Sequence, residues 1–425
     1  MSAAVSIADR ADWLAEPGLQ KLLAALSDGD EEARIAGGAV RNALLGQPVS
    51  DIDVATTTLP EETARRAEQC GFRVVPTGAE HGTMTVMVAG RPVEVTTLRA
   101  DVETDGRHAV VRFGRDWRQD AERRDFTING LYATADGRVI DLIGGLSDLE
   151  RRAIRFIGDP EQRIREDYLR ILRFFRFFAQ YGSGRPDAEG LKACARLREG
   201  IERLSAERVW VELKKLLGAD DPSRALLWMR QAGVLTKVLP ESEKWGIDAV
   251  HGLVAAERDL DWEPDALLRL EAIVPPDAAR MAAMAERLKL SKAEAQRLAD
   301  WAFAPMPQAD AGDGELARIL YRASGRGVED RLALALAAAR AKGASDDGAL
   351  VAAAGFDRQL AYARGWERPV MPVGGEDLKT LGLEPGPAMG KELKRLEEEW
   401  IASGFALDRE ALIAKARLSG PDEPG

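Results

Sequence analysis

The sequence predicts an α+β protein in which a small mixed β-sheet occupies the N-terminal third and helices make up the remainder. Three observations support this fold class. Segments with the alternating or short apolar runs of β-strands recur up to residue 142, and the pattern then stops. From Leu146 onward, apolar residues recur every three or four positions, as in amphipathic helices. A chain of 425 residues is also long enough for several domains. We expect their bounds at residues 1–145, 146–218, 219–305 and 306–425.

The N-terminal region predicts helices and strands in alternation. We expect an amphipathic helix over Ala8 to Leu26, where leucines recur at helical spacing, and a second helix from Pro60 to Gln69. By contrast, Ala100 to Gln119 is polar and poorly periodic, which predicts a long mobile loop. The remaining segments with strand patterns are 72–76, 82–88, 91–98, 131–134 and 139–142.

A pair of glycines, Gly37 and Gly38, is the first candidate binding feature. An apolar segment ends there, a short helical pattern begins at Ala39, and Arg41 lies in the first turn. Glycine lets a backbone approach a ligand closely, and the positive end of a helix attracts anions. The segment therefore predicts a phosphate site formed by Gly37, Gly38 and Arg41. An ordinary turn is the alternative for these residues taken alone.

Three acidic residues lie on nearby strand patterns. Asp51 and Asp53 are two positions apart, so on a strand both side chains leave the same face. Glu94 alternates with Val93 and Val95, and we expect it in the same sheet as a third active-site carboxylate. Paired carboxylates facing a phosphate site are the ligands that two-metal phosphoryl chemistry needs, so Asp51 and Asp53 are the predicted metal ligands. An exposed strand end, and an edge-strand charge at Glu94, are the alternatives.

Charge is distributed unevenly along the chain. The net charge of −11 argues superficially against a nucleic-acid partner. Between Arg151 and Gly218, however, 16 Lys and Arg face 10 Asp and Glu, a local excess of +6. A basic segment within an acidic protein indicates local contact with RNA, and a solvated helix face is the alternative. Two distant cysteines and the lack of an apolar run of about 18 residues predict a cytoplasmic protein without a membrane span.

Two further clusters supply candidate site residues. The first is R-R-D-F-T-I-N at 123–129, just before a strand pattern. The second begins at Glu166 and continues as a strongly helical segment to Phe177. Within it, Asp167 and Arg170 are three positions apart, so they are neighbours on a helix face, with Arg173 one turn further on. An ordinary helix ion pair is the alternative for Asp167 and Arg170.

With these motifs in order, the chain resembles the class II tRNA nucleotidyltransferases, the CCA-adding enzymes that share their architecture with bacterial poly(A) polymerases. The resemblance covers about residues 34–217. It implies a nucleotidyltransferase head of polymerase-β type, followed by an all-α neck, body and tail within the domain bounds given above. The motifs that carry it are G-G-A-V-R through D-I-D, R-R-D with Asn129, E-D with the arginines that follow, and the segment 204–213.

The resemblance also implies a role for each candidate residue. Asp51 and Asp53 would hold two Mg²⁺ ions, with Glu94 beside them. Asp167 and Arg170 would select the base, because a carboxylate beside a guanidinium matches the edges of cytosine and adenine, whereas uracil and guanine present a carbonyl to the carboxylate. The residues implied at the phosphates and ribose of bound CTP or ATP are Arg41, Arg173 and Arg176, together with Arg124, Asp125 and Asn129.

The implied activity is the addition of C, C and A to the 3′ end of tRNA. The tRNA acceptor end and elbow are the implied partners, and a monomer or homodimer is the expected assembly. The loop at 100–119 would govern the change from C to A. The alternatives are a poly(A) polymerase, a small-molecule nucleotidyltransferase and a catalytically inactive tRNA-binding protein. The sequence departs from the family at Asn42, usually Asp, and at Gly130, usually Ala; neither is expected to bind metal.

Overall fold

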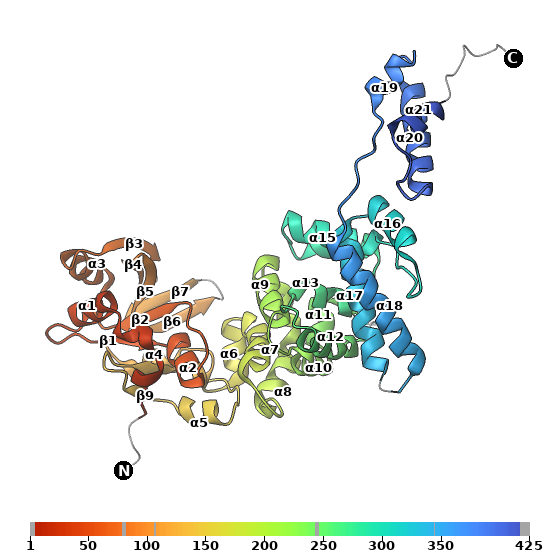
Figure 1. Cartoon of the computed structure of the whole chain (residues 1–425). Helices are drawn as coiled ribbons and strands as arrows, with labels where there is room; N and C mark the ends of the chain where they lie inside the picture. The colour runs from red at the N-terminus through yellow and green to blue at the C-terminus, as the bar shows by residue number, and fades with distance from the viewer. Residues whose placement is uncertain (1–4, 79–81, 106–107, 243–245, 344, 417–425) are drawn as a thin grey trace. The chain divides into compact units, whose positions relative to one another are not determined.

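The computed structural model describes residues 5–78, 82–105, 108–242, 246–343 and 345–416. The chain divides into two compact units, Met1–Pro240 and Glu241–Gly425, and each is considered by itself (Figure 1). Within the described residues, all strands belong to the first unit and helices occur in both. This confirms the predicted α+β class, a mixed sheet followed by helices. The finer division into four domains stays a prediction.

A seven-stranded mixed sheet forms the centre of the first unit. Its strands lie in the order β3-β4-β5-β2-β1-β8-β9. β2 and β5 are parallel, whereas the other neighbouring pairs are antiparallel. The strands are β1 (Ala33–Ala36), β2 (Ile52–Thr56), β3 (Arg73–Gly78), β4 (Thr83–Val88), β5 (Arg91–Thr97), β8 (Leu131–Ala133) and β9 (Val139–Asp141).

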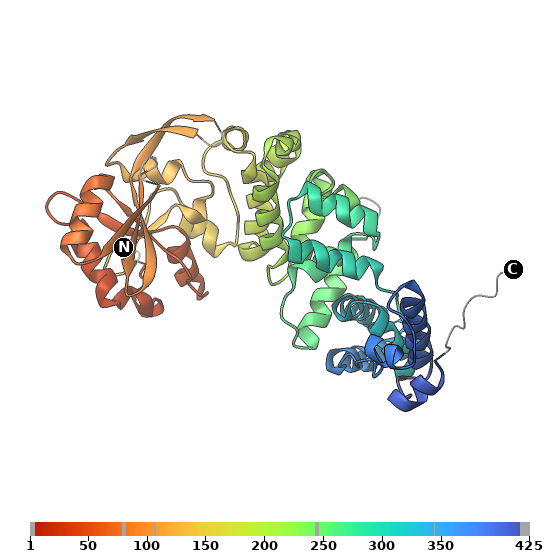
Figure 2. The ribbon, with the colours of Figure 1, turned by 90° about the horizontal axis from the view of Figure 1, so that it is seen from above.

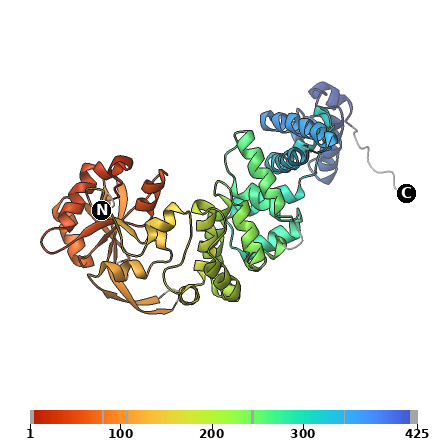
Figure 3. The same cartoon turned by 90° about the horizontal axis from the view of Figure 1, so that it is seen from below.

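Three helices pack against this sheet (Figures 2 and 3). α3 (Pro60–Gln69) contacts β3, β4 and β5, and α1 (Pro17–Leu26) contacts both β1 and α3. α2 (Gly38–Leu45) contacts β1, β2 and β8, which places its first turn beside the strand that carries Asp53. The sheet and α2 together therefore position the predicted phosphate and carboxylate residues.

The helix predicted from Ala8 is wrong in its first half. Two 3₁₀ turns, Ala8–Arg10 and Asp12–Ala15, come before α1. α1 begins at Pro17, whose fixed φ suits the first helical position. The Glu16 carboxylate accepts hydrogen bonds from the first amides of the helix. Proline and cap therefore set the helix start more strongly than the leucine spacing does.

The segment 100–119, predicted as a mobile loop, has regular secondary structure, so the loop assignment is wrong. The segment forms an antiparallel hairpin of β6 (Arg99–Asp105) and β7 (His108–Phe113), followed by helix α4 (Trp117–Glu122). Figures 2 and 3 show this hairpin extending from the region of the sheet. Strand prediction relies on apolar alternation, and this polar segment contains little of it.

The continuous helix predicted from Glu166 to Phe177 is interrupted. α6 (Pro160–Glu166) ends before Asp167, whose backbone is extended with φ −153° and ψ 109°, and α7 (Leu169–Tyr181) starts two residues later. Asp167 Oδ1 accepts a hydrogen bond from the Leu169 amide at 3.1 Å. Aspartate favours such local bonds over a helix interior, which accounts for the break.

Aromatic packing fastens α7 to the head. The Phe126 ring lies 4.9 Å from that of Phe156 and 5.2 Å from that of Phe177, between ring centroids. Phe156 in turn stacks on Phe174 at 5.5 Å. The R-R-D-F segment and α7 therefore share one buried cluster. The other helices of this unit are α5 (Gly145–Glu150), α8 (Ala188–Leu197), α9 (Ala206–Leu217), α10 (Ser223–Gln231) and α11 (Val234–Val238).

The second unit is helical throughout its described residues. The long helices α17 and α18 pack along each other, and α12 and α15 pack on α17 (Figure 1). Among the described helices, none has the length and apolar character to cross a membrane. The bounds are α12 (Asp248–Asp259), α13 (Ala266–Ile273), α14 (Ala278–Arg287), α15 (Lys292–Phe303), α16 (Asp313–Arg322), α17 (Gly325–Gly343), α18 (Asp347–Gly365), α19 (Gly375–Thr380), α20 (Pro387–Ala402) and α21 (Arg409–Ala414).

The space around Gly145 shows that the head is tightly packed next to the R-R-D motif. A Cβ at Gly145 would lie 2.3 Å from the backbone oxygen of Thr127, two residues after that motif. At Gly130 the nearest atom is the terminal methyl of Ile143, also at 2.3 Å, which can rotate away. We expect Gly145→Ala to lower the free energy of unfolding by about 1–3 kcal/mol, and Gly130→Ala to cost less. Urea denaturation compares the two, and equal losses would contradict this packing.

Candidate active site

One cleft in the first unit gathers charged side chains from the head and from the helices that follow it. Its volume is about 480 Å³, within the range of small-molecule sites. The residues from the head that line it are Gly37, Gly38, Arg41, Asp53, Arg123, Arg124, Asp125 and Asn129. The residues from the helices that follow are Asp167, Leu169, Arg170, Arg173, Phe177 and Arg208.

The two glycines make different contributions to the cleft. Gly37 has φ +62°, and a Cβ there would approach Arg124 Nη1 to 3.0 Å, so the position requires glycine. Its amide donates to the Leu131 carbonyl oxygen at 2.9 Å and is not available to a ligand. Gly38 is the first residue of α2, and its amide has no acceptor among the described residues. The Gly38 amide therefore remains available to an anion at this helix start, whereas the Gly37 amide does not.

Arg41 is a buried cation surrounded by neutral hydrogen-bond partners. Only 7% of its surface is exposed. Its Nε and Nη2 donate to Asn42 Oδ1 at 3.1 and 2.9 Å, Nη1 donates to Asn129 Oδ1, and Nη2 also donates to the Tyr181 hydroxyl at 2.9 Å. Burial lowers the pKa of the Arg41 guanidinium below its ordinary value. A substrate anion would offset the cost of burying this charge.

Two of the three predicted carboxylates lie on neighbouring strands, and of the three only Asp53 lines the cleft. Asp53 on β2 is paired in parallel register with Glu94 on β5, and Asp51 lies just before β2. Burial and the negative charges of Glu94 and Asp51 raise the pKa of the Asp53 carboxyl, although Arg124 opposes the shift. A bound cation would relieve this repulsion.

The donor chemistry of these carboxylates fits Mg²⁺. This ion takes one or two protein carboxylates and completes its shell with phosphate oxygens and water. Within the part of the chain that the structure describes, no group of three or more His, Cys, Asp or Glu side chains is arranged to hold a metal ion. Asp51 and Asp53 therefore suit a metal shared with a substrate's phosphates, and not a cage made by protein ligands alone.

Asp125 links the head to α7. Its Oδ1 accepts hydrogen bonds from the Phe126 amide and from Asn129 Nδ2, both at 2.9 Å. Its Oδ2 accepts from Arg173 Nε at 2.7 Å. Burial alone would raise the pKa of the Asp125 carboxyl, but the Arg173 guanidinium and the Asn129 hydrogen bond hold it below the ordinary value. The carboxylate therefore stays charged and keeps α7 against the R-R-D motif.

Asp167 and Arg170 both line the cleft, yet they are not paired with each other. Asp167 forms an ion pair with Arg208 of α9 at 2.7 Å. Arg170 forms one with Glu166 at 2.6 Å. The alternative reading of Asp167 and Arg170 as a helix ion pair is therefore wrong, as is their placement on one continuous helix, because the chain leaves helical geometry at Asp167.

Arg176 lies behind the cleft and is absent from its lining. It is buried, its Nε donates to Glu212 of α9, and its Nη1 donates to Gln180 at 3.0 Å. Arg173, by contrast, lines the cleft. Of the arginines expected at phosphates, the structure thus brings Arg41 and Arg173 to the cleft and leaves Arg176 as a support for α7.

Sequence reasoning missed four residues of the lining: Arg123, Leu169, Phe177 and Arg208. Arg208 reaches Asp167 across 41 positions of sequence because α9 packs on α7. Phe177 places its ring 5.3 Å, at the centroid, from the guanidinium carbons of Arg41 and of Arg173. The cluster R-R-D, with two adjacent arginines, was the signal that could have identified Arg123.

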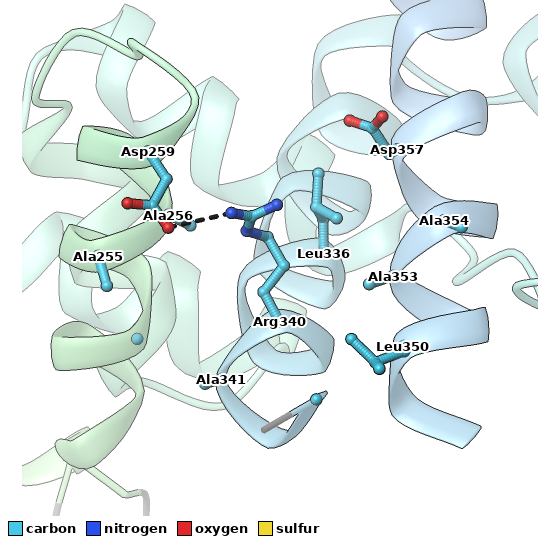
Figure 4. A pocket seen from close by; sticks show the side chains of 12 residues that line it. Ala255, Ala256, Asp259, Leu336, Arg340, Ala341, Leu350, Ala353, Ala354 and Asp357 are labelled. Atoms are coloured by element: carbon cyan, nitrogen blue, oxygen red, sulfur yellow. Dashed lines mark hydrogen bonds and ion pairs between the residues drawn. The ribbon is translucent and has the colours of Figure 1, made fainter. Parts of the chain in front are cut away.

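A second hollow, in the second unit, offers a contrast. It has a volume of about 510 Å³ and lies between α12, α17 and α18 (Figure 4). Arg340 and Asp259 form an ion pair across it at 3.0 Å, and small apolar side chains make up much of the remaining wall. The cleft of the first unit gathers many more charged groups and is the better candidate for catalysis.

Two known family models match segments of this chain. Residues 33–155 match the model of the poly A polymerase head domain. Residues 185–245 match a model described as a probable RNA and SrmB-binding site of polymerase A. The first match spans the sheet and the R-R-D motif, and the second spans α8 to α11.

Relatives and solved structures match over nearly the whole chain. The mitochondrial CCA tRNA nucleotidyltransferase 1 of Mus musculus is 33% identical over 401 residues, covering 93% of this chain and 89% of that protein. The CCA-adding enzyme of Streptococcus gordonii is 34% identical, covering 94% and 95%. The crystal structure of the Bacillus stearothermophilus CCA-adding enzyme in complex with CTP is 25% identical, covers 94% and 95%, and has a TM-score of 0.68. The chain belongs to the family of CCA-adding tRNA nucleotidyltransferases.

Proposed function

We propose that this protein adds C, C and A to the 3′ end of tRNA, using CTP and ATP without a nucleic-acid template. The observation that carries the proposal is one cleft in which a carboxylate of the sheet, a buried arginine with neutral partners and the base-selecting candidates of the neck lie together. Relatives at more than 30% identity are CCA-adding enzymes, which supports the same activity.

The carboxylates would serve nucleotidyl transfer. The 3′-hydroxyl of the RNA attacks the α-phosphorus of the nucleotide and gives up its proton, a new phosphodiester bond forms, and pyrophosphate leaves. Bound Mg²⁺ ions would lower the pKa of that hydroxyl and neutralise charge on the triphosphate. Asp51 and Asp53 are the residues that would hold them, with Glu94 adding negative charge at the next strand.

Arginines and the R-R-D motif would bind the triphosphate and ribose. Arg41 has the least compensated charge, because its hydrogen-bond partners are neutral. The charge of Arg173 is partly compensated by an ion pair with Asp125, and that of Arg124 by an ion pair with Asp120. Arginine's planar fork suits phosphate oxygens. Asp125 and Asn129, hydrogen-bonded to each other, would present the ribose-binding surface.

Asp167 and Arg170 would select the base. Cytosine and adenine each offer an amino group beside a ring nitrogen, so a carboxylate can accept from the first while a guanidinium donates to the second. Uracil and guanine present a carbonyl where Asp167 needs a donor. The ion pair with Arg208 and the Leu169 amide hold the Asp167 carboxylate in place. Protein side chains would thus replace a template.

The tRNA would extend from the cleft along the helices that follow the head. The basic excess at 151–218 and the matched RNA-binding model at 185–245 support this. The same proposal includes contact of the C-terminal tail with the tRNA elbow and a monomeric or homodimeric assembly. It also includes control of the change from C to A addition by the β6–β7 hairpin. The two free cysteines, Cys70 and Cys194, support a reducing, cytoplasmic location.

Activity is tested with purified protein and a tRNA that ends at its discriminator base. CTP alone should extend it by two nucleotides, and CTP with ATP by three. Asp53→Asn should reduce addition to about one per cent or less, because the metal site loses a charged ligand. Asp136→Asn, an exposed aspartate in the β8–β9 turn, is the matched control. Extension by ATP alone into a longer tail would indicate poly(A) addition instead.

Metal binding is tested by stability, independently of activity. The raised pKa of Asp53 means that metal-free wild type loses stability as pH rises from the ordinary pKa of aspartate through the folded value. Asp53→Asn should therefore be the more stable protein at neutral pH without metal, and the advantage should vanish in acid. Mg²⁺ should raise the Tm of wild type and not of Asp53→Asn. Equal stabilisation of both by Mg²⁺ would remove Asp53 from the metal site.

Base selection is tested by competition of all four nucleotides on one tRNA. Asp167→Ala should weaken CTP and ATP use and admit UTP and GTP, since a bidentate contact contributes about 1–3 kcal/mol of discrimination. Asp187→Ala, which removes the cap of α8 outside the cleft, should cost stability without changing selectivity. An Asp167→Ala enzyme that still prefers C and then A would contradict the assignment.

A further inference from the structure

Tyr181, the last residue of α7, reaches back to the head and contacts Arg41. Its hydroxyl accepts a hydrogen bond from Arg41 Nη2 at 2.9 Å, and its ring centroid lies 4.1 Å from the guanidinium carbon. The same ring lies 5.6 Å from that of Phe177. Tyr181 falls between the two segments that the family models match, 33–155 and 185–245. The rings of Tyr181 and Phe177 therefore form an aromatic contact surface for the Arg41 guanidinium.

This aromatic contact surface orients the Arg41 guanidinium without neutralising its charge. A carboxylate in the same place would fix Arg41 but would also compensate its charge, whereas a phenol and an aromatic face orient a cation and leave its charge in place. Within the described residues, Arg41 forms no ion pair. The nearby Asp125 carboxylate is already bonded to Arg173. Arg41 is thus held rigidly while its charge remains available to an anion.

We propose that Tyr181 is a positioning residue that holds Arg41 against the triphosphate of the incoming nucleotide, whichever base that nucleotide carries. The inference rests on the proposed nucleotidyl transfer. Tyr181 is not part of the cleft lining, so it acts through Arg41. Because α7 also carries Arg170 and Arg173, one helix links Arg41 of the head to the base-selecting candidate Arg170 and to the second cleft arginine, Arg173.

Pyrophosphate is the probe that isolates this contact, because it has phosphates and no base. Its inhibition constant should rise about fivefold in Tyr181→Phe, which loses the hydroxyl, and about 30-fold in Tyr181→Leu, which also loses the ring. KM should rise by the same factor for CTP and ATP. The preference for CTP over UTP and the affinity for tRNA should not change.

Coupling to Arg41 is tested in a second background. Arg41→Lys removes the fork that contacts Tyr181, so adding Tyr181→Phe to it should have no further effect on the pyrophosphate inhibition constant. Tyr321→Phe is the matched control, because it deletes a hydroxyl bonded at 2.7 Å to Glu397 in the second unit. It should leave pyrophosphate inhibition unchanged.

Two outcomes would overturn the proposal. One is a pyrophosphate inhibition constant in Tyr181→Phe equal to that of wild type, which decides the matter even if Tyr181→Leu does not fold. The other is a change in base preference or tRNA affinity as large as the change for pyrophosphate, which would indicate general distortion. Failure of the wild-type protein itself to extend tRNA would instead contradict the proposed function.

Discussion

The ion pair between Asp125 and Arg173 is the interaction on which the candidate site depends. Asp125 belongs to the R-R-D motif of the head, and Arg173 lies in the middle of α7. The contact measures 2.6 Å, and the Asp125 side chain is buried whereas the Arg173 side chain is 32% exposed, so removing Arg173 would leave a buried carboxylate unpaired. The aromatic cluster of Phe126, Phe156 and Phe174 also joins the head to α7, because Phe126 follows Asp125 in the chain and Phe174 follows Arg173.

This junction gives two distant parts of the sequence a common geometry. On the head side, Asn129 bonds both to Asp125 and to Arg41, so the anchored carboxylate also orients the buried arginine. On the neck side, α7 begins beside Asp167, whose partner Arg208 comes from α9. The phosphate-binding and base-selecting candidates are therefore parts of one hydrogen-bonded arrangement, and a shift of α7 would alter both.

The sequence predicted the parts of the site that depend on local pattern, and less of what depends on packing. Alternation around Glu94 correctly placed it beside Asp53, because strand periodicity is a local property. The break at Asp167 was missed, since a side-chain cap competes with the helix in a way that apolar spacing does not record. The structural role of Arg176 and the contact of Arg208 with the cleft were missed because both depend on packing against α9: Arg176 bonds to Glu212 of α9, 36 positions away, and Arg208 of α9 bonds to Asp167, 41 positions away. Tertiary contacts at that separation leave no periodic signal.

The central claim is that protein side chains alone distinguish the bases, with no RNA needed to read them. Equilibrium binding of CTP, ATP, UTP and GTP to the protein with Mg²⁺ and without tRNA tests it most directly, because only protein groups are then present. Isothermal titration calorimetry should show CTP and ATP binding more tightly than UTP and GTP, by about tenfold or more for a contact of at least 1.4 kcal/mol. Equal affinity for all four nucleotides would contradict the account.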